Sequence, residues 1–154
     1  MAEIFDKLKK QYNLPDLDEI EEVFEISVDE EKENLILQAV RNAVADKLYE
    51  LLKTLESVIF TGEGSDPDAL YEEKMVEGVS KDGFDLYKKF NYYYYFALRL
   101  RYEHDRKKDA EFLLALIKDW KEMEKSLKLF FAQMEKGWKD MAASSKIDDE
   151  NYHG

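Results

Sequence analysis

Apolar side chains recur along most of the chain at intervals of three and four residues, the spacing that places them on one face of an α-helix. Proline, glycine and clusters of polar residues separate the segments that carry this pattern, and we expect six helices. The predicted helices span about 2–12, 16–25, 29 or 33–60, 66–76, 82–104 and 106–142.

The three long segments each carry a single apolar stripe, which predicts that each helix buries one face in a common core. The stripes consist of Leu37, Val40, Val44, Leu48, Leu51, Leu55 and Val58; Leu86, Phe90, Tyr93, Ala97, Leu100 and His104; and Leu113, Leu116, Trp120, Met123, Leu127, Phe130, Met134, Trp138 and Met141. Short connections between them favour antiparallel neighbours. We therefore expect an all-α fold, a helical bundle built on three long antiparallel helices with two or three shorter helices. Residues 1–143 should form one helical domain, and residues 144–154, which lack periodicity, a flexible tail.

The charge balance narrows the possible partners. The chain of 154 residues carries 35 acidic and 23 basic side chains, a net charge of −12, which disfavours nucleic acid and anionic lipid as partners. It contains no cysteine, so disulfides and thiolate chemistry are excluded. The first residues are charged and amphipathic, and no apolar run is as long as a membrane span, so we expect a cytoplasmic protein without membrane association. Abundant Lys and Glu with only three Gln are typical of thermophilic proteins.

The most unusual stretch is Phe90–Tyr102, FNYYYYFALRLRY, which places four consecutive tyrosines inside a predicted helix. Tyr93 belongs to the apolar stripe, whereas Tyr92, Tyr95, Arg99 and Tyr102 share roughly the opposite side of the helix. Tyrosine and arginine are enriched where proteins contact one another. The pattern therefore predicts a partner-binding surface, but it leaves open whether the two short N-terminal helices cover this stripe.

A second candidate surface is the acidic stretch 16–33, which holds ten acidic residues and one lysine. It is either a solvated helix face or a docking surface for a partner, and in the second case we expect Glu19, Glu22, Glu30 and Glu33 to make contacts. Carboxylates spaced by three residues on a helix can also hold a divalent metal. Glu22-x-x-Glu25 resembles the first half of the magnesium motif of the MazG nucleotide pyrophosphatases, and that resemblance implies Glu22 and Glu25 as metal ligands.

A third feature is the pair Arg99 and His104, separated by four residues in RLRYEH. This spacing resembles the motif of HEPN ribonucleases, which are small helical domains that commonly work as dimers. The resemblance implies that the arginine steadies phosphate charge and that the histidine assists RNA cleavage. The residues alone also allow a simpler interpretation, in which His104 lies at the C-terminal end of a helix and interacts with the helix dipole.

Phosphate-binding loops, serine nucleophile motifs and calcium loops find no match in the sequence. We therefore expect a non-enzymatic protein–protein interaction module or a small subunit of a larger assembly, without a cofactor, that binds a protein partner or forms a homo-oligomer. A HEPN-like ribonuclease and a magnesium-dependent pyrophosphatase are the alternatives.

Overall fold

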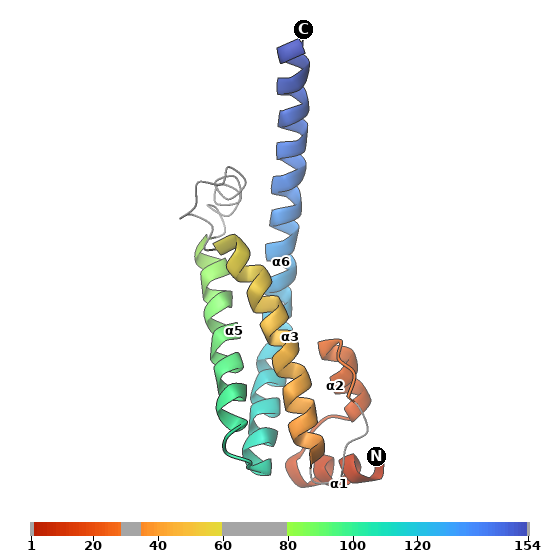
Figure 1. Ribbon diagram of the computed structural model, residues 1–154. Helices are drawn as coiled ribbons and strands as arrows, with labels where there is room; N and C mark the ends of the chain where they lie inside the picture. Colours follow the sequence, from red (N-terminus) through yellow and green to blue (C-terminus); the bar gives the residue numbers. More distant parts are fainter. Residues whose placement is uncertain (1, 29–34, 60–79, 154) are drawn as a thin grey trace. The chain divides into compact units, whose positions relative to one another are not determined.

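The computed structural model describes residues 2–28, 35–59 and 80–153, and most of these residues lie in helices (Figure 1). The helices are α1 (Ala2–Tyr12), α2 (Leu17–Phe24), α3 (Ile36–Ile59), α5 (Ser80–Leu100) and α6 (Arg106–His153). The described ranges contain no strand, so the all-α bundle is confirmed. The short helix predicted over 66–76 lies outside the described residues, as do Glu30 and Glu33. Among the helices seen here, none combines the length and the apolar character that crossing a membrane would require.

Local sequence explains where the two N-terminal helices stop and start. α1 ends at Tyr12 because Asn13 adopts a left-handed conformation with φ 56°, and Leu14 precedes a proline, which disfavours helical backbone. The amide of Leu14 donates to the Lys9 carbonyl over 3.0 Å, which closes the end of α1. Asp16 then occupies the N-cap of α2 and forms an ion pair with Lys9 of α1. This ion pair links the end of α1 to the beginning of α2.

The turn between α5 and α6 differs from the prediction. α5 ends at Leu100 rather than at His104, and the amides of residues 101–103 donate to carbonyls three residues earlier in a tighter turn. His104 was expected on the buried stripe, but it is exposed and has φ 51°. Asp105 provides the N-cap of α6, because its carboxylate accepts hydrogen bonds from the amides of Lys107 and Lys108 at 3.0 and 3.3 Å.

α6 continues to His153, well beyond the end predicted at residue 142. The apolar stripe is buried as far as Met134, but Trp138, which was expected in the core, is 42% exposed. The apolar residues of α6 keep their helical spacing beyond Met134. That spacing does not show where the neighbouring helices stop covering them. Flexibility of residues 144–154 in solution stays a prediction.

The chain divides into two compact units. Unit 1 comprises residues 1–53 and 88–121. It contains α1, α2, the first part of α3, the second part of α5 and the first part of α6, with α5 antiparallel to α3 and α6 (Figure 1). At its centre the Phe24 and Phe90 rings lie 4.8 and 6.0 Å from the Trp120 ring, so α2 and α5 both pack on α6.

Unit 2 comprises residues 54–87 and 122–154. Its described part consists of the end of α3, the beginning of α5 and the remainder of α6. Gly83 lies on α5 against the Phe130 ring of α6, and a β-carbon at this position would come within 3.3 Å of that ring. The Tyr87 hydroxyl donates to the Glu56 carboxylate over 3.0 Å, which links α5 to α3. Phe130 and the Tyr87–Glu56 bond thus join all three long helices within this unit.

Candidate functional site

The four consecutive tyrosines of α5 have three different environments. Tyr93 is buried among the residues facing α6, and Tyr94 is half-buried with its ring 5.6 Å from that of Tyr49 on α3. Tyr92 and Tyr95 are exposed. A helix advances by about 100° per residue, so adjacent tyrosines must point in different directions. The run therefore supplies side chains to the core, to the contact with α3 and to the outer surface.

Tyr93 anchors α5 on α6. Its hydroxyl donates to the Asp119 carboxylate and lies 3.2 Å from the Ala115 carbonyl oxygen. Burial is the largest cause that raises the pKa of Tyr93 above its ordinary value, and the hydrogen bond and negative charge of Asp119 raise it further. The phenol is therefore held neutral, and the helix is fixed in a rotation that leaves Tyr92 and Tyr95 outside.

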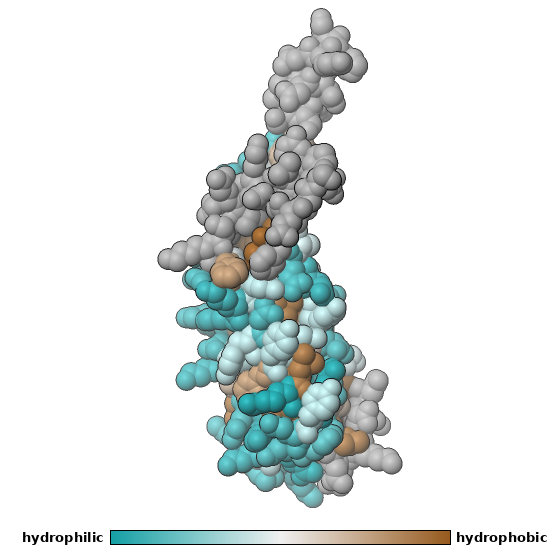
Figure 2. Space-filling model, turned by 60° about the vertical axis from the view of Figure 1, so that its left-hand side comes forward, coloured by the Kyte–Doolittle hydropathy of each residue, from teal (hydrophilic) through white to brown (hydrophobic). Residues whose placement is uncertain are grey.

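The outer side of α5 and the turn that follows form the candidate site. We define the tyrosine face as Tyr92, Tyr95, Arg99 and Tyr102. The three tyrosines are 62%, 64% and 86% exposed, and the Arg99 side chain is 62% exposed. Figure 2 views the molecule from the α5 side, where pale and brown side chains gather among teal ones.

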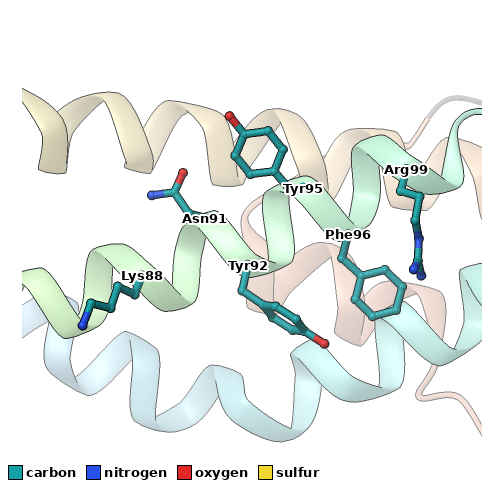
Figure 3. A pocket seen from close by; sticks show the side chains of 6 residues that line it. All are labelled: Lys88, Asn91, Tyr92, Tyr95, Phe96 and Arg99. Atoms are coloured by element: carbon teal, nitrogen blue, oxygen red, sulfur yellow. The ribbon is translucent and has the colours of Figure 1, made fainter.

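A groove of about 410 Å³ lies on this face. Figure 3 shows how its walls are arranged: Tyr92, Phe96 and Arg99 point toward α6, whereas Asn91 and Tyr95 point toward α3. The Arg99 guanidinium lies 5.1 Å from the centre of the Phe96 ring, in cation–π contact. It also lies 3.7 Å from the Glu103 carboxylate. Lys88 lies at the opposite end of the groove from Arg99 (Figure 3), so the groove combines aromatic walls with a cation at each end.

The short N-terminal helices do not cover the tyrosine face. α2 lies on the other side of α3 from α5, and α1 lies by the N-terminal end of α3 (Figure 1). Phe24 packs α2 on α6. Phe5 and Leu8 of α1 and Ile20 of α2 are buried in unit 1. The interpretation in which these helices hide the stripe is therefore wrong, and Tyr92 and Tyr95 are exposed to solvent.

A buried ion pair fixes the end of the face. Arg41 of α3 is 3% exposed and Asp109 of α6 is 1% exposed, and Nη1 of Arg41 lies 2.6 Å from Oδ1 of Asp109. The same nitrogen donates to the Leu100 carbonyl at the C-terminus of α5, over 3.3 Å. Arg41 therefore holds the end of α5 and the start of α6 together, and the turn between them carries Tyr102. Burial raises the pKa of Asp109, and the hydrogen bond from Arg41 opposes this effect.

The sequence around the tyrosine face is basic, although the chain as a whole is acidic. Residues 88–108 contain seven basic and two acidic side chains, a net charge of +5 within a chain of −12. Some of this charge is compensated locally, since Arg101 lies 3.9 Å from Asp46 and Lys108 lies 2.8 Å from Glu103. A charge sum taken in short windows along the sequence would have identified this segment, whereas the total did not.

The second predicted surface is only partly described. Glu19 and Glu22 are exposed on α2 beside Val23, which is 42% exposed. Glu25 follows the end of α2 and has φ 53°, so Glu22 and Glu25 do not lie on one continuous helix. The Glu25 carboxylate lies 3.6 Å from the Lys47 ammonium. In ranges 2–28, 35–59 and 80–153, no three potential metal-ligating side chains come together.

The arginine and histidine of the ribonuclease-like motif lie on either side of the end of α5. Arg99 is in the last helical turn, and His104 is in the connection to α6. Both side chains are exposed. Leu100 between them is buried, as its place on the apolar stripe predicts.

Comparisons of this chain with protein-family models, with curated proteins and with solved structures each found no match.

Proposed function

We propose that the chain is a protein–protein interaction module that binds its partner through the tyrosine face. The observation that carries this proposal is the exposure of Tyr92 and Tyr95 on the outer side of α5 and of Tyr102 in the turn that follows. Each tyrosine can bury about 200 Å² in a contact, and a two-torsion side chain loses little entropy when it is fixed. Arg99 adds a planar cation to the same surface, and arginine shares with tyrosine the tendency to dominate binding energy.

The scaffold beneath the face supports this role. Tyr93 and the Arg41–Asp109 pair fix the rotation and the end of α5 from below. A surface whose backbone is already rigid loses less conformational entropy on binding. The exposed rings therefore form a preorganised contact surface rather than a loose segment.

The test is a tagged pull-down from lysate of the source cells, with mass spectrometry of the eluted proteins. We expect a stoichiometric partner that is retained by the natural chain and lost by the double variant Tyr92→Ala/Tyr95→Ala. Leu129→Ala is the matched control, because Leu129 is 55% exposed in unit 2, away from the tyrosine face in sequence. A partner that both variants retain equally would contradict the proposal.

A HEPN-like ribonuclease is the second candidate, and the net charge of +5 over residues 88–108 favours it. Arg99 and His104 are both exposed, and the resemblance to HEPN ribonucleases implies that they act on an RNA phosphate. This candidate predicts cleavage of single-stranded RNA by the purified chain. His104→Ala would remove that cleavage while the far-ultraviolet circular dichroism spectrum stays unchanged. Under the interaction proposal, the same variant keeps its partner.

A further inference from the structure

We infer that the tyrosine face binds the acidic outer surface of α2 in a second copy of this chain. This inference rests on the proposed function, because it assigns a partner to the same face. It starts from the opposite charges of two segments of unit 1, of which the basic one contributes Lys88 and Arg99 to the groove on the tyrosine face. Residues 88–108 carry a net charge of +5, whereas residues 16–25 carry six acidic side chains and no basic one.

The outer surface of α2 has the chemistry that the tyrosine face requires. Glu19, Glu22 and Val23 are neighbours at spacings of three and four residues, and all three are exposed. Val23 offers a methyl-bearing side chain to the aromatic rings. The two carboxylates can accept hydrogen bonds from tyrosine hydroxyls and from the Arg99 guanidinium.

The contact must form between copies. α2 packs on α6 through Phe24 and lies on the far side of α3 from α5, so it does not reach the tyrosine face of its own chain (Figure 1). One copy thus carries an acidic helix surface on one side of α3 and, on the other, a tyrosine face whose groove is lined by Lys88 and Arg99. Contacts between two different surfaces either close into a ring or continue as a chain of molecules.

The total charge of −12 does not forbid this contact. At physiological ionic strength, charges further apart than about 8 Å are largely screened. The electrostatics of the contact are therefore set by the few groups that meet in it, and these have opposite signs. The exposed ion pair between Arg99 and Glu103 is of the kind that contributes little to stability, so Arg99 can exchange this partner for a carboxylate of α2.

The size of the tyrosine face sets the expected affinity. At about 200 Å² per aromatic side chain, the exposed fractions of the three tyrosines amount to about 400 Å². A standard interface buries about 800 Å² on each partner. The contact is therefore expected to be reversible, with a dissociation constant of about micromolar or weaker.

Analytical ultracentrifugation of the full chain tests the inference. The average mass of the natural chain should rise between about 10 µM and about 1 mM, a range suited to small contacts. A face variant, Tyr92→Ala/Tyr95→Ala, and an α2 variant, Glu22→Lys/Val23→Ala, should each remain monomeric. All four substituted side chains are exposed, and circular dichroism verifies that both variants fold.

The decisive sample is an equimolar mixture of the two variants. The face variant retains an intact α2, and the α2 variant retains an intact tyrosine face, so together they can form one contact. The mixture should form a 1:1 dimer that neither variant forms alone. Leu129→Ala, an exposed substitution in unit 2, should associate like the natural chain.

Three outcomes would overturn the inference. The natural chain could stay monomeric throughout, the α2 variant could associate as strongly as the natural chain, or the mixture could stay monomeric. Binding of oligo(dT) by a monomeric natural chain, lost in the face variant, would assign the face to single-stranded nucleic acid instead. A monomeric chain that still captures a lysate protein through Tyr92 and Tyr95 would overturn the self-contact and leave the proposed function standing.

Discussion

Breaking the Arg41–Asp109 pair should destabilise unit 1 far more than removing both charges together. Arg41→Met leaves the Asp109 carboxylate buried without its cation, and Asp109→Asn leaves the guanidinium without its anion. Both side chains are almost completely buried and joined at 2.6 Å. Removing one member of such a pair costs about 3–5 kcal/mol, because an uncompensated charge remains in the interior.

The double variant Arg41→Met/Asp109→Leu should lose much less than the sum of the single variants. Replacing a buried pair by apolar side chains of similar volume is often close to neutral. Incomplete hydrogen bonding strengthens this expectation, because Nε of Arg41 is buried and bonds to nothing within the described residues. We expect the double variant to recover at least about 3 kcal/mol relative to additivity.

The assay is urea unfolding followed by tryptophan fluorescence in a Trp138→Phe background. Trp120 is then the remaining tryptophan, and it reports on unit 1, where the ion pair lies. Single variants that each lose less than about 1 kcal/mol would refute the reasoning, because exposed pairs contribute that little. A double variant that loses the sum of the single losses would refute it as well.

The pH dependence provides a second observable from the same variants. Burial raises the pKa of Asp109 and the bond from Arg41 lowers it, so Arg41→Met should raise that pKa further. A carboxyl whose pKa is higher in the folded chain than in the unfolded chain binds its proton more tightly when folded. The stability that this proton contributes is complete at a pH below the unfolded-state pKa, and it is lost as the pH rises through the folded-state pKa. The destabilisation by Arg41→Met should therefore be smaller near pH 4 than at pH 7. A loss that is the same at both pH values would contradict this assignment.

Further predictions concern Tyr93 and the two tryptophans. Tyr93→Phe removes the hydroxyl bonded to Asp119 and should lower the free energy of unfolding by about 1–3 kcal/mol, whereas Tyr92→Phe should leave it within about 0.5 kcal/mol in urea titrations. Because the pKa of Tyr93 is raised, the natural chain should lose stability above about pH 10. The difference in free energy of unfolding between the natural chain and Tyr93→Phe should therefore shrink above that pH. A difference that stays constant would contradict the burial of this phenol. Trp120→Ala should cost about 3–5 kcal/mol, and Trp138→Ala should cost less than about 1 kcal/mol by thermal or urea unfolding, so equal losses would place Trp138 in the core after all.

Sequence periodicity predicted the fold because it reports which side of each helix is apolar. It could not show how far neighbouring helices extend, and for this reason Trp138 and His104 were assigned to a core that does not reach them. The buried ion pair left no pattern either. Arg41 and Asp109 are 68 positions apart, and an arginine or aspartate in a helix is ordinarily solvated.

The tyrosine face was predicted as a stripe from helical geometry alone, since Tyr92, Tyr95 and Arg99 are separated by three and four residues. Its exposure depends on where α1 and α2 pack, and that is decided by contacts such as Phe24 with Trp120. The basic segment around it was present in the sequence but was hidden by the strongly acidic remainder.

Site-specific photocrosslinking tests the tyrosine face most directly. A photoreactive benzoylphenylalanine replaces Tyr95 in one variant and Leu129 in another, both at exposed positions, and each variant is irradiated in source-cell lysate. The interaction proposal predicts one defined crosslinked product from position 95 that is lost when Tyr92 and Arg99 are also changed to alanine, and no such product from position 129. An absence of product at position 95, or the same products at both positions, would contradict the claim that the tyrosine face is where this chain meets its partner.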